Sequence, residues 1–186
     1  MEDFVDELLA MAESGEIKGI EEYLSRNVSV DIRKPGSGKS MLMAAASYGD
    51  LGVIRLLANN GAHIELRDSD GNTALMYAIE YGKLEAVKLL LEIGADPNAR
   101  ANDGWTPLMS SVNDGRRDMA ELLLHYGADP FARDNEGGMA KDYAVASGNR
   151  GMLELFEGIE NLGRSIKESV IGLKRSVQAS KRMMAH

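Results

Sequence analysis

Residues 68–100 read DSDGNTALMYAIEYGKLEAVKLLLEIGADPNAR, and residues 101–133 read ANDGWTPLMSSVNDGRRDMAELLLHYGADPFAR. The two stretches share glycines, leucines and a closing GADP motif at an offset of 33 residues. The same offset relates Gly38, Gly71, Gly104 and Gly137, which extends the pattern in both directions. A fixed period of this length predicts a repeat protein, in which similar units stack along one axis.

Each unit carries the signals of a turn followed by two short helices. In the unit 68–100, Gly71 belongs to a turn, because glycine readily adopts the positive φ angle that such turns require. Thr73 then stands where a helix N-cap belongs, and apolar residues at helical spacing follow it. Gly82 and Gly94 end the two helices. One such unit cannot bury its apolar face alone, so stacking must form a continuous core.

This pattern resembles the ankyrin repeat. The segments that carry the resemblance are TALM at 73–76, TPLM at 106–109, GADPNAR at 94–100 and GADPFAR at 127–133, with weaker copies SMLM at 40–43 and GAHIELR at 61–67. The resemblance implies an all-α fold, an ankyrin-repeat solenoid of stacked helix-turn-helix units with β-turn fingers. The family usually has histidine after the TPL motif, where this chain has Met43, Met76 and Met109. We expect these methionines to form a buried apolar column.

The first and last units depart from the inner pattern, as the ends of a solenoid do. The predicted organisation is a cap at 1–34, repeats at 35–67, 68–100 and 101–133, a second cap at 134–160, and a basic amphipathic C-terminal helix or tail at 161–186. In the last unit, Lys141 stands where an inner repeat has leucine. The residues expected to be buried between repeats are Leu75, Leu90, Leu91, Leu108, Leu123 and Leu124.

Composition and charge narrow the functional classes. The net charge is −8, but residues 161–186 carry +5, which leaves −13 on residues 1–160. Because an acidic body repels phosphates, no nucleic-acid partner is expected. The chain has no cysteine, which excludes disulfides and thiolate metal sites. An acidic N-terminal segment and the lack of any apolar run of about 20 residues predict a cytoplasmic chain without a membrane span.

The segment GSGKS at 36–40 looks like the end of a phosphate-binding P-loop. The full motif requires glycine where Arg33 stands, and the repeat already explains Gly38 as a turn residue and Ser40 as an N-cap. A nucleotide-binding protein is therefore the least favoured alternative, and Lys39 is expected to be an exposed finger residue. The histidines stand alone, without a second histidine or paired carboxylates at metal-binding or catalytic spacing. No catalytic, cofactor-binding or metal-binding residue is predicted, and the chain is not expected to be an enzyme.

In ankyrin proteins generally, partners contact the fingers and the exposed face of each first helix, which together form a concave surface. Carried onto this chain, the resemblance implies that another protein binds at Tyr48, Asp70, Asn72, Glu80, Tyr81, Asp103, Trp105, Asn113, Asp114 and Glu136. Further positions on the same face are Lys39, Ser47, Ser69, Asn102 and Asn135. The expected role is that of an adaptor or a stoichiometric inhibitor.

Three aromatic residues stand out on this face. Tyr48 and Tyr81 share one position of the repeat, and Trp105 is the single tryptophan of the chain. We expect all three to be substantially exposed as anchors for a partner, in an acidic field that favours a basic contact surface. The alternative is that Trp105 packs on a neighbouring finger and that the tyrosines only shield the core.

Arginine also recurs with the period, at Arg67, Arg100 and Arg133. Such a column is expected to pair with neighbouring acids, for example Asp68 or Asp134, rather than with a ligand.

The C-terminal segment has its own pattern. Residues 159–184 carry an apolar stripe at helical spacing, formed by Ile159, Leu162, Ile166, Val170, Leu173, Val177 and Met184. Six Lys and Arg residues flank the stripe, and it lacks Trp and Phe, which counts against strong membrane insertion. We expect this stripe to be covered by protein, either by the repeats, by a second copy or by a partner. A membrane- or partner-tethered scaffold acting through this helix remains the alternative function.

Overall fold

The computed structural model describes residues 2–26 and 28–161, with side chains from residue 4 onward. The helices within these ranges are α1 (Glu2–Ser14), α2 (Ile17–Ser25), α3 (Met41–Tyr48), α4 (Leu51–Asn59), α5 (Ala74–Glu80), α6 (Leu84–Glu92), α7 (Pro107–Asn113), α8 (Arg117–His125) and α9 (Ala140–Ala146), followed by helical residues 150–161. No strand is assigned within the described part of the chain. The structure is therefore the all-α solenoid that the repeat predicts.

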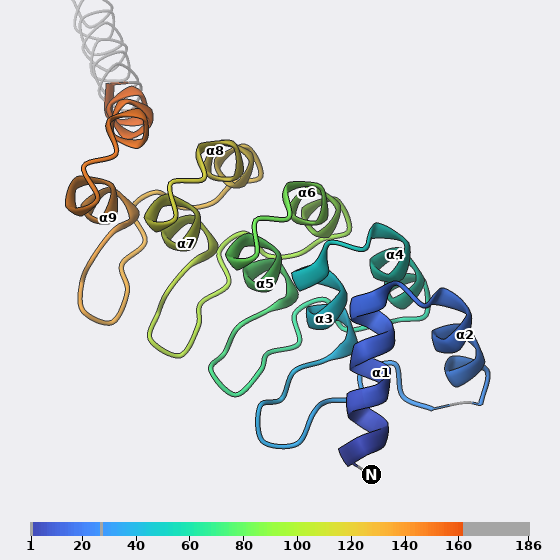
Figure 1. Ribbon diagram of the computed structural model, residues 1–186. Coiled ribbons are helices and arrows are strands. Elements are labelled where there is room, and N and C mark those ends of the chain that lie inside the picture. Colours follow the sequence, from blue (N-terminus) through green and yellow to red (C-terminus); the bar gives the residue numbers. More distant parts are fainter. Residues whose placement is uncertain (1, 27, 162–186) are drawn as a thin grey trace, which may run out of the picture.

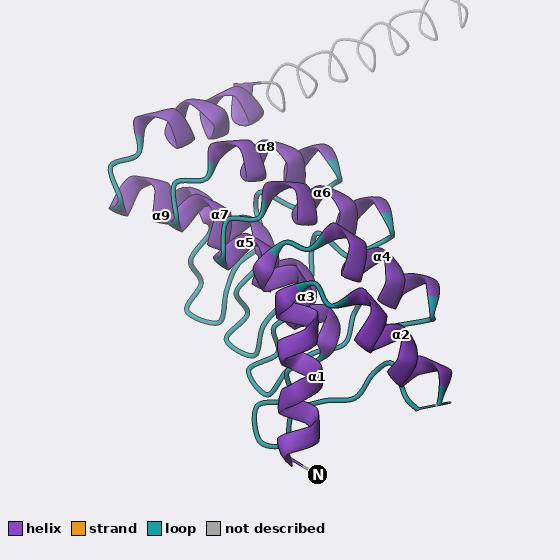
Figure 2. Cartoon of the chain, turned by 45° about the vertical axis from the view of Figure 1, so that its right-hand side comes forward, coloured by secondary structure: helices purple, strands orange, loops and turns teal. Residues whose placement is uncertain are grey.

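The helices form two layers (Figures 1 and 2). Helices α1, α3, α5, α7 and α9 contact one another in chain order and make the first layer. The second helix of each unit lies beside the first, in a second layer that runs from α2 to residues 150–161. The N-terminal unit and the C-terminal unit therefore occupy opposite ends of the stack (Figure 1).

The starts of the helices follow the predicted capping residues. The side chain of Ser40 accepts a hydrogen bond from the backbone of Met43 (3.3 Å), and that of Thr106 accepts one from Met109 (3.2 Å). Both satisfy a donor that the first helical turn leaves free. Thr73 has the extended backbone of an N-cap, but its buried hydroxyl has no hydrogen-bond partner among the described residues. At this position the backbone follows the repeat, although the side-chain bond is missing.

The core between the layers is aliphatic. Leu75, Leu90, Leu91, Leu108 and Leu123 are buried, which confirms the predicted stacking residues. The expected methionine column is buried as well, at Met43, Met76 and Met109.

Leu124 was predicted to be buried, but this prediction is wrong, because the side chain is only half-buried. Its equivalent in the preceding unit, Leu91, is 5% exposed. In the last unit the equivalent residue is Glu157, which is exposed. The apolar column therefore ends at Leu124, with no leucine beyond it to complete its cover.

A finger connects each unit to the next. The fingers are residues 34–39, 68–72, 101–105 and 134–138, and each is closed by a backbone hydrogen bond between its ends. Backbone bonds also join neighbouring fingers, since Asn102 donates to the carbonyl of Asp70 (2.8 Å) and Asn135 to that of Asp103 (2.9 Å). These bonds fix the spacing between fingers and align their tips in a row.

No helix in the described ranges is long and apolar enough to cross a membrane. The predicted amphipathic segment 159–184 lies outside the described residues, apart from 159–161, which are helical. Its expected cover and its alternative scaffold role therefore stay predictions.

Candidate functional site

The predicted contact residues fall into two parallel rows. One row lies on the fingers and contains Asp70, Asn72, Asp103, Trp105 and Glu136. The other lies at the C-terminal ends of the first-layer helices and contains Tyr48, Glu80, Tyr81, Asn113 and Asp114. A first-layer helix of seven residues, about 10 Å long, separates the rows. We call these two rows with the helices between them the finger face.

Two tyrosines dominate the helix-end row. Tyr48 is the last residue of α3 and is 56% exposed, and Tyr81 follows α5 and is 53% exposed. Their equivalence in the repeat brings them to the same place in neighbouring units. A side chain with this much apolar area in water is available to a partner, so the expectation of exposure is confirmed for both tyrosines.

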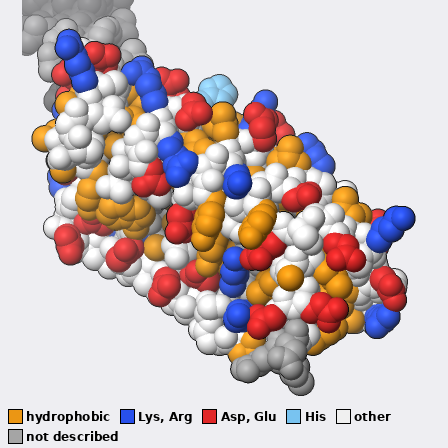
Figure 3. All heavy atoms as spheres, in the orientation of Figure 1, with side chains coloured by type: hydrophobic (Ala, Val, Ile, Leu, Met, Phe, Trp, Pro, Cys, Tyr) orange, Lys and Arg blue, Asp and Glu red, His pale blue; other side chains and the backbone are white. Residues whose placement is uncertain are grey.

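Acidic side chains follow the fingers, and Glu80 lies beside Tyr81. Figure 3 shows Asp and Glu along the edge that the fingers form, with hydrophobic side chains in separate groups over the helices. Asp70, Glu80, Asp103 and Glu136 are exposed and form no ion pair within the described part of the chain. Asp114 differs, because its carboxylate lies 3.4 Å from the guanidinium of Arg116. Four of the five predicted acids therefore contribute uncompensated negative charge.

Trp105 is half-buried, which corrects the expectation of substantial exposure. Its ring packs against the ring of Tyr143 in α9, with centroids 4.5 Å apart and planes tilted by 59°. It therefore packs on the first helix of the next unit, whereas the alternative had named the neighbouring finger. The contact contributes to stacking of the last unit, and only part of the indole faces solvent.

Lys39 occupies the position equivalent to Trp105 in the first full repeat and behaves in the same way. Its ammonium lies 5.4 Å from the centroid of the Tyr77 ring in the next unit and forms an ion pair with Glu13 at 3.0 Å. The side chain is 21% exposed, so the expectation of a free finger residue is wrong. The residue before the N-cap is thus placed to contact the following unit.

The finger that contains GSGKS uses its polar groups internally. The backbone amide of Gly38 donates to Lys34, and that of Lys39 donates to the hydroxyl of Ser37. Ser40 caps α3. The amides of Gly38 and Lys39 are therefore occupied, and the ammonium of Lys39 is held by Glu13 and not directed at a bound phosphate.

Ser47 is a second correction to the predicted surface. It is 2% exposed, and its hydroxyl donates to the backbone carbonyl of Ala44 at 2.7 Å. Because it faces the core, Ser47 does not belong to the finger face.

The arginine column has a structural role, but its partners are not the expected acids. Arg67 donates to the carbonyl of Gly71 (3.0 Å) in the finger that follows it and to that of Arg100 (2.5 Å), the residue directly before the next finger. Arg133 donates to the carbonyl of Gly137 at 2.6 Å. Backbone oxygens therefore take the place that Asp68 and Asp134 were expected to fill.

Those two aspartates instead accept hydrogen bonds from tyrosines. The hydroxyl of Tyr77 donates to Asp68 (2.9 Å), and the hydroxyl of Tyr143 donates to Asp134. Each pair joins the base of a finger to the helix that follows it. Sequence reasoning missed these pairs, although one signal was available, because both members recur together at an offset of 66 residues.

The hydrogen bond between Tyr143 and Asp134 shifts the pKa of both residues. The hydroxyl of Tyr143 and the backbone amides of Glu136, Gly137 and Gly138 lower the pKa of Asp134, against the effect of burial. The same hydrogen bond, followed by burial and nearby carboxylates, raises the pKa of Tyr143 to about 12. At Tyr77 burial is the largest cause, and the bond to Asp68 adds to it, so its pKa is also raised.

The lowered pKa of Asp134 gives a testable pH dependence. The ionised carboxylate stabilises the fold at any pH above the unfolded pKa of about 3.9, and this stabilisation is lost as the pH falls through the folded value. We expect the gap in unfolding free energy between the natural chain and Asp134→Asn to be constant above about pH 5 and to shrink below it. Urea denaturation at a series of pH values measures this gap. Asp70→Asn, at an exposed carboxylate, is the control, and a gap that persists undiminished to acid pH contradicts the assignment.

Within the described ranges, no group of three or more His, Cys, Asp or Glu side chains is placed to hold a metal ion. The finger face offers exposed aromatic rings and carboxylates, which suit recognition of a protein surface.

Comparison with known families agrees with the architecture. A family model described as ankyrin repeats, in three copies, matches residues 8–101. A second model, for a single ankyrin repeat, matches residues 103–135. A search of curated proteins finds no match to this sequence.

Proposed function

The chain belongs to the ankyrin-repeat family, and from this premise we propose that it is an adaptor or a stoichiometric inhibitor that binds its partner through the concave finger face. Ankyrin repeats are protein–protein interaction modules, so the general role follows from the family. The proposal adds the surface, the contact residues and the consequence of binding. It assigns the chain no catalytic step.

The observation that carries the proposal is the exposure of Tyr48 and Tyr81 at one position of consecutive repeats. The solenoid does not need large rings there, because the same position is Asp114 in the next repeat and Ser147 in the last unit. Tyrosine is enriched among the residues that dominate binding energy, since its ring buries a large area and its hydroxyl still forms a hydrogen bond. Two such rings in neighbouring units give a partner two anchor points.

Charge supports a partner with a basic contact surface. Asp70, Asp103 and Glu136 line the fingers, and Glu80 lies beside Tyr81. Acids at the rim of an interface speed association with a basic partner and disfavour acidic ones, more than they add to final affinity. We therefore expect the association rate to fall as salt is added, while the tyrosine contacts set the dissociation rate.

A double variant tests the proposal. Tyr48→Ala/Tyr81→Ala is expected to weaken binding of the partner at least about tenfold, because truncating a central aromatic anchor commonly costs more than 1 kcal/mol. Affinity capture with the natural chain identifies the partner, and calorimetry with the purified pair measures the loss.

The matched control is Tyr126→Ala, which removes another exposed tyrosine, after α8 and away from both rows. Binding within about twofold of the natural chain is expected for this control. Equal binding by the double variant and the natural chain would show that the partner uses another surface.

A further inference from the structure

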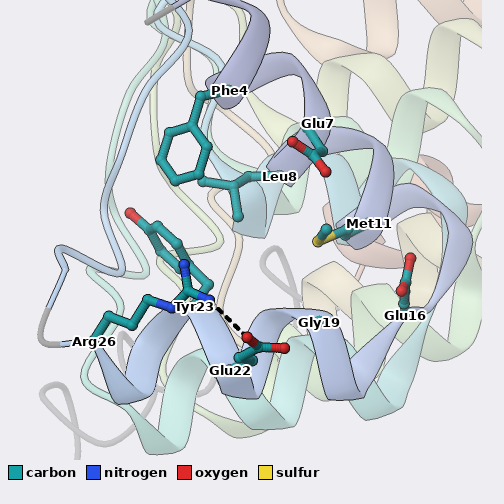
Figure 4. Close-up of a pocket in the computed structure, with 9 residues that line it drawn as sticks. All are labelled: Phe4, Glu7, Leu8, Met11, Glu16, Gly19, Glu22, Tyr23 and Arg26. Atoms are coloured by element: carbon teal, nitrogen blue, oxygen red, sulfur yellow. Dashed lines mark hydrogen bonds and ion pairs between the residues drawn. The ribbon is translucent and has the colours of Figure 1, made fainter.

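A second surface lies at the N-terminal end of the solenoid. There α1 and α2 enclose a hollow of about 310 Å³, shown in Figure 4. Its apolar lining consists of the exposed Phe4 and the half-buried Met11, together with Leu8 and Tyr23, which are buried, and the ring centroids of Phe4 and Tyr23 lie 5.7 Å apart. The hollow is remote from the finger face residues of the inner repeats and plays no part in the function proposed above.

The repeat explains why this hollow exists. The first unit aligns with the second at an offset of 34, so Glu7 corresponds to Met41 and Gly19 to Val53. Met41 and Val53 are both fully buried in their unit. Among the described residues, no unit packs over these positions of the first unit. At these positions the first unit has Glu7, which is acidic, and Gly19, which has no side chain. The end surface is therefore recessed and negatively charged.

The acids of α1 whose side chains the structure describes divide into two sets. Asp6 pairs with Lys34 at 2.7 Å and Glu13 with Lys39 at 3.0 Å, and both pairs face the first finger. Glu7 lines the hollow and has no ion pair among the residues that the structure describes.

The hollow also contains two acids that α2 and its N-cap supply. Glu16 has no ion pair in the described part of the chain, whereas Glu22 is 2.6 Å from Arg26, as the dashed line in Figure 4 marks. Glu7 and Glu16 are therefore two acids of the hollow that form no ion pair within the described residues.

A ligand that fits this surface has an apolar stripe bordered by cations. Residues 162–186 of this chain have that composition, with a charge of +5 and apolar residues at helical spacing from Leu162 to Met184. We propose that the hollow between α1 and α2 binds the basic amphipathic segment 162–186 of a second copy of this chain.

The distance along the stack favours binding of the segment from a second copy over binding of the segment from the same molecule. Residue 161 ends the described chain at the opposite end of the stack from α1 (Figures 1 and 2). Four steps between first-layer helices, at about 8–10 Å each, place α1 some 32–40 Å away. In helical form, the segment reaches about 37 Å. As one continuous helix, it would use its whole length to reach its own hollow, with none left to bind there.

The test uses a fluorescent peptide with the sequence of residues 159–184, titrated into the full chain and followed by anisotropy. We expect saturable binding that weakens with salt, because charge pairs at the rim are screened. The variant Glu7→Lys/Glu16→Lys should bind the peptide at least about tenfold more weakly. The control Glu85→Lys/Glu92→Lys makes the same change of charge at exposed positions of α6 and should bind within about twofold of the natural chain.

Exchanging the charges of the peptide and the hollow distinguishes direct contact between them from a general effect of net charge. A peptide with Lys174→Glu and Arg175→Glu should bind the natural chain more weakly and the Glu7→Lys/Glu16→Lys variant more tightly than the natural peptide does. Sedimentation of the full chain should show association that grows with concentration and is reduced in the same variant. Equal losses in both charge variants, or a natural chain that stays monomeric well above the peptide's Kd, would overturn the proposal.

Discussion

Replacement of Leu90 by alanine is expected to lower the free energy of unfolding by about 2–5 kcal/mol. Leu90 lies in α6, is fully buried, and has fully buried equivalents at Leu57 in the unit before and Leu123 in the unit after. The truncation removes apolar contacts and leaves a cavity lined by units on both sides. Because each unit is held by its neighbours, the cavity cannot collapse without disturbing two interfaces.

Urea denaturation followed by circular dichroism measures this effect, with Lys88→Ala as the control. Lys88 is exposed on the same helix, so its replacement should change stability by no more than about 0.5 kcal/mol. A loss below about 1 kcal/mol for Leu90→Ala is the size of a surface effect. That result would contradict the position of Leu90 in the stacked core.

The periodic part of the fold could be predicted because it depends on signals that recur within each unit. Turn glycines, N-cap residues and leucines at helical spacing act locally, so a repeat seen several times identifies them with little ambiguity. Leu75 and Leu108 illustrate this, since their motif alone places them in the core. Leu124 shows the limit, because its burial depends on the unit that follows and not on its own motif.

Contacts between units were harder to predict. Trp105 and Lys39 were expected to face solvent, yet each packs on the ring of a tyrosine in the first helix of the next unit. The sequence gives no distance between fingers and neighbouring helices, so these partners, 38 residues away, are not apparent from it.

The arginines show the same limit. Arg67 stands next to Asp68 in the sequence, but its guanidinium donates to the backbone carbonyls of Gly71 and Arg100. Asp68 is unavailable to it, because that carboxylate accepts bonds from its own finger and from Tyr77. Other donors occupy the carboxylate of Asp68, so Arg67 bonds to backbone carbonyls. This arrangement is apparent only in the folded structure.

The spacing of the fingers gives the second prediction of large effect. Gly104 has φ of 85° and is buried, and a Cβ atom there would lie 2.9 Å from the backbone nitrogen of Asn135. That nitrogen donates to Asp103, which is one of the bonds that align neighbouring fingers. Gly104→Ala is expected to cost about 2–4 kcal/mol of unfolding free energy, since backbone strain and overpacking add. Urea denaturation measures the loss.

Gly137 offers a matched control for this change. Its φ is 89°, close to that of Gly104, but a Cβ atom there would meet no other atom within 4 Å. Gly137→Ala should therefore show the strain alone, about 1–2 kcal/mol. The difference between the two variants measures the contacts around Gly104, with Asn135 of the next finger and with the guanidinium of Arg100, because the backbone conformation is nearly the same. Equal losses at the two sites would mean that the fingers can separate at little cost, and that their backbone bonds do not hold the finger face in its shape.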